Sequence, residues 1–167
     1  MEIVVNDTNI FIDLCCVDLL EEFFMLPYEV HTLDMVLAEL THKEQRRSVE
    51  TFVERGKLYV HKMSGEEIMN VSSFMKGVSN QLSFTDCAAC CYAKENGYTL
   101  LAADGNLRKT AKRIDIKVCG SIFLFDEMVK NNVITTVEAA IKLEKLRSMN
   151  QRLPQKDIDD RIQKWKK

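Results

Sequence analysis

The sequence predicts an α/β fold, in which helices cover both faces of a mainly parallel sheet. Short β-branched or apolar segments alternate along the chain with longer segments of helical character, as strands joined by helical crossovers do. The clearest unit spans residues 82–113, where a helix, a turn, a buried strand and a second helix follow one another. At 167 residues, the chain is most simply one domain with a single core.

Five segments have the composition of buried strands. The first, residues 2–6, is rich in β-branched residues and ends at Asp7. The fourth, residues 99–103, is an apolar run that ends at Asp104, as a buried parallel strand does when it delivers a side chain to the edge of a sheet. The other expected strands are residues 29–32, 58–61 and 116–118.

Helices are predicted between these strands from capping residues and apolar spacing. Ser83 and Asp86 form a capping box, and Gly97 is placed for a left-handed helix end. Ser64 caps an earlier helix, and Pro154 precedes the last one. The expected helices are residues 10–25 (one or two helices), 34–40, 44–55, 64–78, 83–96, 105–113, 121–130, 136–147 and 155–167.

The composition excludes several classes of protein. Hydrophobic residues make up 46% of the chain and charged residues 29%, which is ordinary for a globular protein and argues against disorder. The formal net charge is −2, so any binding of nucleic acid must use local basic groups or metal ions. No apolar run approaches the ~20 residues that span a bilayer, and the first residues lack the basic segment of a signal peptide. We therefore expect a cytoplasmic protein without membrane association.

The six cysteines do not form a zinc-binding pattern. Cys15 and Cys16 are adjacent, whereas Cys87, Cys90 and Cys91 share one predicted helix, and neither set supplies two paired knuckles. We expect the helical trio to pack as small buried hydrophobes, with free thiols in a reducing cytosol.

Four acids occupy the ends of predicted elements in distant parts of the chain. Asp7 and Asp104 follow strands, Asp86 opens a helix and Glu39 lies on the helix after the second strand. Taken singly, each has a simple structural role, as a helix cap, half of a capping box or a partner of Lys43. Because ligands bind beyond the carboxyl ends of parallel strands, the joint placement favours one shared site.

The same segments resemble the PIN-domain ribonucleases, including the VapC-like toxins of bacterial toxin–antitoxin pairs. The resemblance covers residues 1–134 and is most specific in residues 82–113. It implies a three-layer α/β/α domain with about five parallel strands in the order 3-2-1-4-5, and residues 135–167 would form a helical extension packed on it. The matching segments are VVNDTNIFIDL, HTLDMVLAEL, LSFTDCAACCYAKENGYTLLAADGNLRKTAKR and IDIKVCGSIFLFDEMVKNNVI.

The resemblance assigns roles to the four acids. Asp7, Glu39, Asp86 and Asp104 match the family's four metal-binding acids in chain order, with Glu39 as a ligand or a water-orienting group. One departure is Ala103, since many members of the family carry Ser or Thr just before the last acid. The missing hydroxyl would weaken the support of the site without removing a metal ligand. The candidate supporting residues are Thr8, Asn9, Thr85 and Asn106.

The chemistry of this acid set agrees with the resemblance. Carboxylate oxygens are hard ligands that select Mg²⁺ or Mn²⁺, and such ions polarise a phosphate and lower the pKa of a bound water. Close carboxylates without cations would repel one another, and a metal ion removes that conflict. We expect an Mg²⁺- or Mn²⁺-dependent endoribonuclease that acts on single-stranded or structured RNA.

Basic residues follow two of the acids at helical spacing, provided that one helix continues through residues 39–47. They could hold flanking RNA phosphates, or they could be ordinary solvated helix surface. The three histidines do not cluster in the sequence, so a histidine-based nuclease has no support. The candidate phosphate-binding residues are Lys43, Arg46, Arg47, Arg108 and Lys112.

Two other functional classes remain open. A phosphate-accepting receiver-type regulator would need two adjacent acids after an early strand, and VVNDTN supplies one. A PIN-like binding module without catalysis is the second, and the retention of all four acids argues against it. The resemblance implies an RNA substrate, a cognate antitoxin and a second copy of the chain as partners. The apolar segment of residues 10–25 is the candidate dimer face, because Phe23, Phe24 and Met25 cannot all face inward on one helix and at least one should pack against another element or another chain.

Two apolar stripes characterise the C-terminal segment. Each is too narrow to stabilise an isolated helix, so we expect the helices to dock on the rest of the chain. The rival interpretation is a mobile basic end that attracts RNA. The stripes are Ala139, Ala140, Leu143 and Leu146, and Ile158, Ile162 and Trp165.

Overall fold

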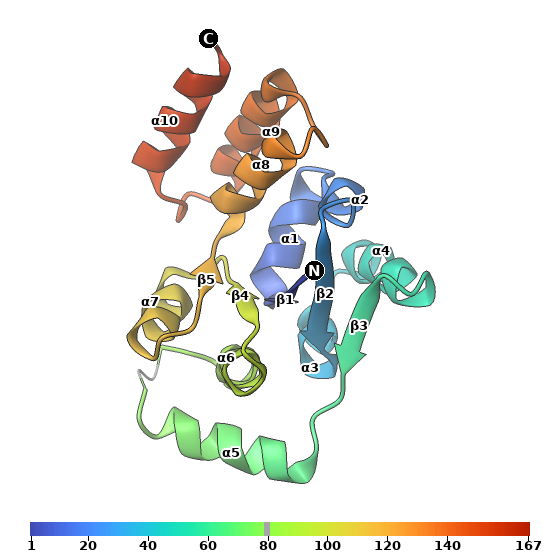
Figure 1. The fold of residues 1–167 in the computed structure, drawn as a ribbon, viewed down its shortest axis with the longest axis vertical. Helices are drawn as coiled ribbons and strands as arrows, with labels where there is room; N and C mark the ends of the chain where they lie inside the picture. Colours follow the sequence, from blue (N-terminus) through green and yellow to red (C-terminus); the bar gives the residue numbers. More distant parts are fainter. Residues whose placement is uncertain (79–80) are drawn as a thin grey trace.

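The computed structural model describes residues 1–78 and 81–167. Five strands form one all-parallel sheet in the order β3-β2-β1-β4-β5 (Figure 1), which confirms the predicted class and strand order. The strands are β1 (Glu2–Asn6), β2 (Tyr28–Leu33), β3 (Leu58–His61), β4 (Thr99–Leu101) and β5 (Val118–Cys119).

Strand β1 forms the centre of the sheet because its apolar residues are buried on both faces. Val4 pairs with Val30 of β2 on one side and with Thr99 of β4 on the other. Val4 and Val5 are buried, as expected of a parallel strand covered on both faces. The carboxyl ends of β1, β2 and β4 therefore point to the same edge of the sheet.

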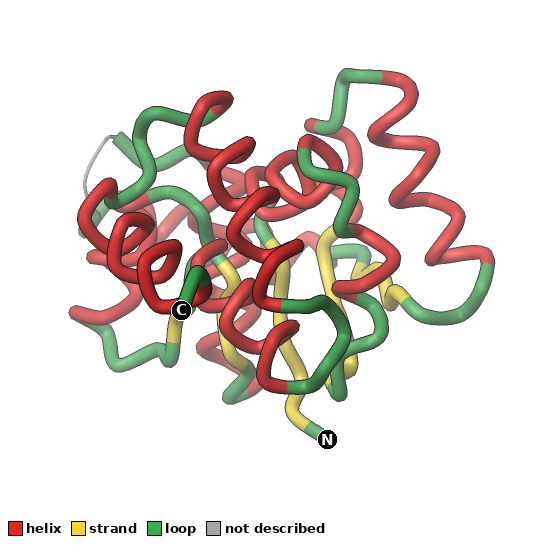
Figure 2. Tube along the Cα trace, turned by 90° about the horizontal axis from the view of Figure 1, so that it is seen from above, coloured by secondary structure: helices red, strands yellow, loops and turns green. Residues whose placement is uncertain are grey.

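Helices follow or connect the strands throughout the described chain. The helices are α1 (Thr8–Cys16), α2 (Leu20–Phe23), α3 (Asp34–Glu39), α4 (Lys43–Glu54), α5 (Gly65–Met75), α6 (Phe84–Asn96), α7 (Gly105–Arg113), α8 (Ser121–Lys130), α9 (Thr136–Met149) and α10 (Gln155–Trp165). Figure 1 shows α6, with α5 beyond it, on one side of the sheet, and α1 and α4 on the other. Seen from above, the strands run inside a shell of helices (Figure 2).

The helix expected to continue past Glu39 is interrupted. Leu40 leaves the helical conformation with φ −75° and ψ 85°, and its side chain is buried. His42 then starts α4, where its ring Nδ1 accepts a 3.4 Å hydrogen bond from the backbone N–H of Gln45. The condition that one helix carries both Glu39 and the basic residues of 43–47 is therefore not met.

Strand β5 is shifted along the chain from its expected position. Ile116 lies in the turn that follows α7, where its N–H donates a 2.9 Å hydrogen bond to the carbonyl of Ala111. The sheet contact is made by Lys117 and Cys119, whose carbonyls accept hydrogen bonds from Leu100 and Ala102. The strand is consequently Val118–Cys119 rather than residues 116–118.

The aromatic pair before β2 faces the interior of its own chain. Phe23 and Phe24 are both buried, and the Phe24 ring stacks on Phe52 of α4 with ring centres 4.1 Å apart. Met25, the third residue of this series, is 62% exposed. Phe23 and Phe24 thus pack against other elements of the same chain, and the dimer through residues 10–25 stays a prediction.

The C-terminal helices lie against the rest of the chain. The apolar stripes of α9 and α10 are buried, with Leu143 and Ile158 fully enclosed. The Arg161 guanidinium also binds the Asp126 carboxylate of α8, with Nη2 3.0 Å from Oδ2. The division of the chain at residue 134 stays a prediction. Over residues 1–78 and 81–167, no helix has the length and apolar character needed to cross a membrane.

Candidate functional site

Asp7 occupies the junction between the central strand and the first helix. It caps α1, since its Oδ1 accepts a 2.8 Å hydrogen bond from the N–H of Ile10. Its Oδ2 accepts a 3.3 Å hydrogen bond from the N–H of Ala103, just beyond β4. The side chain is buried, so the fold fixes both oxygens at the carboxyl edge of the sheet.

Asp104 reaches the same edge from the neighbouring strand. Asn6 and Leu101 are paired in the β1–β4 ladder, so the residues that follow them emerge side by side. Asp104 caps α7, and its Oδ1 accepts a 2.7 Å hydrogen bond from the N–H of Asn106. Its half-buried carboxylate leaves one oxygen without a protein donor among the described residues.

Asp86 and Glu39 complete the acid set from two helices. Asp86 is the third residue of α6 and closes a capping box with Ser83. Glu39 ends α3 and is exposed, but its Oε2 accepts a 2.9 Å hydrogen bond from the hydroxyl of Thr8. That bond ties the end of α3 to the start of α1, next to Asp7.

The electrostatics show that the acids act on one another. Burial, with a smaller contribution from the charge of Asp86, raises the pKa of Asp7 to about 8 against the opposing hydrogen bond from Ile10. Burial likewise raises the pKa of Asp86, with smaller contributions from the charges of Asp104 and Glu39. Asp86 therefore lies within electrostatic range of the other three carboxylates, whose charges oppose its ionisation.

The acid cluster has suitable donors for a divalent metal ion, although the described residues include no ready-made ligand group. In the described ranges, no three histidine, cysteine, aspartate or glutamate side chains converge closely enough to form a metal-binding group. The donor set nevertheless fits Mg²⁺ or Mn²⁺, because it consists of carboxylate oxygens and no soft ligand. The raised pKa of Asp7 is the other observation in favour, since a cation would relieve the cost of its buried charge.

The supporting residues suggested by the sequence play different parts. Thr8 contacts Glu39 through its hydroxyl, as described above. Asn106 contacts Asp104 through its backbone N–H, a role that does not depend on its amide side chain. Asn9 is exposed and lines a pocket beside Asp104. Thr85 lies in the first turn of α6, half-buried next to Asp86.

The three basic candidates of α4 lie on its exposed surface. Lys43, Arg46 and Arg47 are all exposed. Arg46 forms an ion pair with Glu50, with Nε 2.7 Å from Oε1. Because residues 40–42 separate α3 from α4, the positions of these basic residues relative to Glu39 depend on that turn rather than on helical spacing.

Arg108 has a structural role that the sequence did not reveal. Its Nη1 donates hydrogen bonds to the carbonyls of Ala102 (3.0 Å) and Ala103 (2.7 Å). Gly120 leaves room for this guanidinium, because a Cβ at that position would lie 3.3 Å from Nη1. Arg108 therefore clamps the segment that donates to Asp7, while the exposed Lys112 lines a cavity beside it.

Two buried polar residues near the site were not singled out from the sequence. Asp13 of α1 accepts a 2.7 Å hydrogen bond from Ser121 and a 3.4 Å one from Asn150. Asn6 is fully buried, and its side-chain amide has no hydrogen-bond partner in the part of the chain that the structure describes. The sequence signal that could have identified Asp13 and Asn6 is that each is a polar residue in an otherwise apolar segment.

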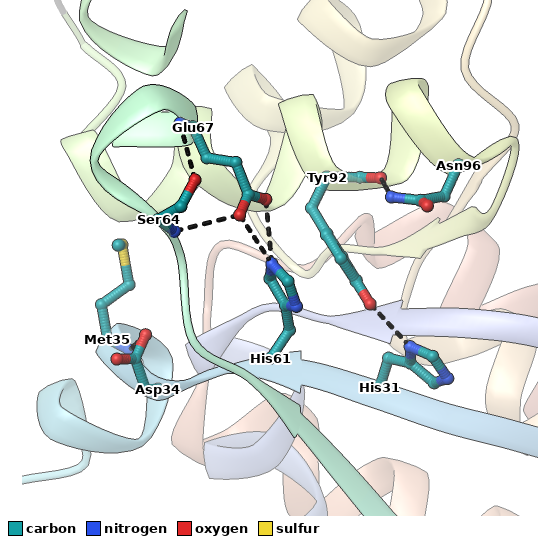
Figure 3. A network of polar contacts seen from close by, with 8 residues as sticks. All are labelled: His31, Asp34, Met35, His61, Ser64, Glu67, Tyr92 and Asn96. Carbon is teal, nitrogen blue, oxygen red and sulfur yellow. Dashed lines mark hydrogen bonds and ion pairs between the residues drawn. The ribbon is translucent and has the colours of Figure 1, made fainter. Parts of the chain in front are cut away.

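The histidines that are apart in the sequence do come together in part. Figure 3 shows Tyr92 reaching from α6 toward His31, whose Nδ1 lies 2.9 Å from the tyrosine oxygen. His61 stacks on the same ring at 4.7 Å between ring centres, and its Nε2 lies 2.8 Å from Oε2 of Glu67. These contacts fix α5 and α6 against β2 and β3, which helps to position the helix that carries Asp86.

Comparisons with known proteins agree with this fold. The family model "DUF3368: PIN domain" matches residues 3–167. A PilT N-terminus domain protein from the archaeon Sulfolobus solfataricus P2 is 13% identical over 76% of this chain and 93% of its own, with a TM-score of 0.51. VapBC-1 from nontypeable Haemophilus influenzae is 17% identical over 71% and 98%, with a TM-score of 0.50. No curated protein matches the sequence.

The class defined by the parallel sheet and its acid edge is thus a PIN-like α/β domain. Because the family model spans nearly the whole sequence, the chain belongs to the PIN domain family.

Proposed function

We propose that the protein is an Mg²⁺- or Mn²⁺-dependent endoribonuclease that hydrolyses phosphodiester bonds in RNA. The observation that carries the proposal is the gathering of four carboxylates from β1, α3, α6 and β4 at one edge of the sheet. Burial is the main cause of the raised pKa values of Asp7 and Asp86, and the charge of Asp86 adds to the first while those of Asp104 and Glu39 add to the second, so these acids lie within electrostatic range of one another.

In the proposed mechanism, Asp7, Asp86 and Asp104 hold the divalent ion. When bound, such an ion polarises the scissile phosphate and acidifies an attacking water. Glu39 is a further ligand or orients that water, and the Thr8 hydroxyl fixes its position. The N–H groups of Ile10 and Ala103 hold the two oxygens of Asp7 in place, so that little reorganisation is needed.

The RNA backbone is proposed to lie along the basic residues that flank this edge. The contacts would go to phosphates, which add affinity without choosing a sequence. Arg108 is already engaged with backbone carbonyls, so its contribution would be mainly to hold the turn before Asp104. The proposed phosphate-binding residues are Lys43, Arg46, Arg47, Arg108 and Lys112.

We also propose that the protein is the toxin of a toxin–antitoxin pair, located in the cytoplasm, with a cognate antitoxin and a second copy of itself as partners. The similarity to VapBC-1 supports the antitoxin, and the six free cysteines agree with a reducing compartment. Light scattering at ~100 μM, well above typical dimer dissociation constants, tests the homodimer, which a monomeric mass would exclude.

The test of the nuclease is cleavage of a mixed single-stranded RNA pool with Mg²⁺ or Mn²⁺ and with EDTA. Wild-type protein should cut only with the metal, and Asp104→Asn should lose turnover by orders of magnitude, since a metal ligand supplies several kcal/mol of transition-state stabilisation. Asp160→Asn, the same chemical change at an exposed residue of α10, should cut normally. Retained RNA binding without cleavage by the wild type would favour the binding-module alternative.

A further inference from the structure

A pocket of about 290 Å³ lies beside the acid edge, with walls from three parts of the chain. One wall is α1, through Asn9, Ile12 and Asp13; the β4–α7 turn contributes Asp104. The opposite wall is the end of α9 and the following turn, through Met149, Asn150 and Arg152, among other residues. The C-terminal helices therefore complete a cavity next to a proposed catalytic residue.

Asp104 relates the pocket to the proposed site. Of the four acids, Asp104 is the one that lines the cavity. A substrate group held in the pocket would therefore have its adjoining phosphate next to the carboxylates. This arrangement suits a nucleoside that flanks the scissile bond.

The walls have the chemistry of a nucleobase site rather than that of a phosphate site. Ile12, Leu146 and Met149 offer apolar surface for the faces of a flat ring. Two carboxylates, Asp13 and Asp104, would repel a phosphate inside the cavity. Arg152 is the cation among the described lining residues, and it is exposed, so it is placed to meet a phosphate at the rim.

Asp13 offers a free hydrogen-bond acceptor in the pocket wall. Ser121 donates to its Oδ2 at 2.7 Å, whereas Oδ1 receives a single long hydrogen bond of 3.4 Å from Asn150. A carboxylate oxygen can accept two hydrogen bonds, so Oδ1 has capacity for a ligand donor. Carboxylates in such positions accept from exocyclic amino groups of bases, as they do from the amino group of cytosine.

We propose that this pocket binds the base next to the scissile phosphate and selects bases that carry an exocyclic amino group, through Oδ1 of Asp13. The assignment rests on the proposed nuclease function and adds a source of sequence preference, which the phosphate contacts lack. Met149 forms part of the opening, because its side chain lines the pocket and is 56% exposed.

Matched pairs of nucleotides test the binding without any cleavage. The backbone amide resonance of Gly105, which lines the pocket, is followed by NMR during titration with AMP against IMP and CMP against UMP. Each pair differs by replacement of an amino group with a carbonyl. We expect the amino forms to bind about ten-fold more tightly, the effect of one hydrogen bond to a charged acceptor. Equal affinities within both pairs would overturn the proposal.

Two variants separate the pocket from the overall fold. Asp13→Asn should bring the AMP-to-IMP ratio close to one. Met149→Trp should fill the opening and weaken all four nucleotides, whereas Ile141→Trp should not, because Ile141 is an exposed apolar residue of the same helix outside the pocket. If Asp13→Asn fails to fold, the comparison of Met149→Trp with Ile141→Trp tests the pocket. Equal nucleotide affinities of these two variants would overturn the proposed site.

Sequencing of cleaved RNA ends distinguishes the two proposals. Wild-type protein and Ile141→Trp should share one base preference next to the cut, and Met149→Trp should lose it while still cutting the pool. Cleavage with no preference and no nucleotide binding would overturn the pocket and leave the nuclease intact. Nucleotide binding with the predicted preference but no cleavage of RNA would overturn the nuclease function and leave the pocket as a nucleotide-binding site.

Discussion

The hydroxyl of Thr8 donates a 2.9 Å hydrogen bond to Oε2 of Glu39, although 31 positions separate the two residues. Glu39 ends α3 just before the chain turns at Leu40, so its side chain has few other restraints. The bond therefore gives an exposed carboxylate a fixed direction at the acid edge. In a site that depends on precise oxygen positions, such support contributes to function more than to stability.

Thr8→Val should accordingly lower RNA cleavage about 10- to 100-fold, the usual effect of losing a residue that orients a metal-site ligand. The volume of the side chain is kept, and the change in unfolding free energy should stay within about 0.5 kcal/mol because the bond is exposed. Thr8→Ser, which keeps the hydroxyl, is the control and should retain most activity. Equal cleavage rates for Thr8→Val and wild type would contradict the role of this bond.

Metal binding should be visible in thermal stability without any RNA. An ion that binds only the folded protein stabilises it by about 2.7 kcal/mol at a concentration of 100 times its Kd. We expect Mn²⁺ to raise the melting temperature of the wild type and to raise that of Asp104→Asn much less. Calorimetry with and without EDTA measures both shifts. The same shift in the two proteins would mean that the ion binds elsewhere.

Arg108 and Gly120 should be coupled energetically. Arg108→Met loses the hydrogen bonds to Ala102 and Ala103, at a cost on the order of 1–2 kcal/mol, because such charged donors contribute about 1.5–3 kcal/mol and this one is half-buried. Gly120→Ala should destabilise the wild type by displacing the guanidinium, but much less in the Arg108→Met background. Urea unfolding of the four proteins measures the coupling, and Lys112→Met on the same helix is the control. If the two substitutions change the free energy of unfolding additively, Gly120 is not needed to make room for the Arg108 side chain.

The burial of Asp13 should give folding stability a specific pH dependence. Burial raises the pKa of Asp13 in the folded protein, and the hydrogen bonds from Ser121 and Asn150 oppose this shift only in part. Its contribution to stability is therefore fully present below the unfolded pKa of about 4 and is lost as the pH rises through the folded value. Compared with Asp13→Asn, the wild type should become progressively less stable from pH 4 toward neutrality. Melting temperatures across this range measure the difference, and an opposite slope would contradict the assignment.

The sequence was sufficient for the sheet because its strands are short apolar runs between clear helix signals. β1 and β4 pair as parallel neighbours, and capping boxes at Ser64 and Ser83 begin the helices expected there. The position of Asp7 follows from the same logic, since the residue after a buried parallel strand has to emerge at the carboxyl edge. Local sequence and topology are enough for that conclusion.

Features that depend on side-chain packing could not be predicted. Residue spacing alone could not decide whether the helix continues past Glu39, and the chain leaves the helix at the buried Leu40. Arg108 had the spacing of a phosphate ligand, but its contact with the Ala102 and Ala103 carbonyls depends on the space that Gly120 leaves, twelve residues further along the chain. The pocket beside Asp104 needs the end of α9, which no local pattern places next to α1.

Asp86 closes the capping box of α6, and two other acids are the N-cap residues that begin helices: Asp7 for α1 and Asp104 for α7. Asparagine begins a helix about as well as aspartate, whereas alanine costs about 1 kcal/mol at such a position. A single-nucleotide change converts any aspartate codon into one for asparagine. If the proposed metal site and partners are correct, one mutational step would abolish metal binding in a chain that still folds and still occupies those partners, so an inactive copy of the gene would compete with the active one rather than disappear.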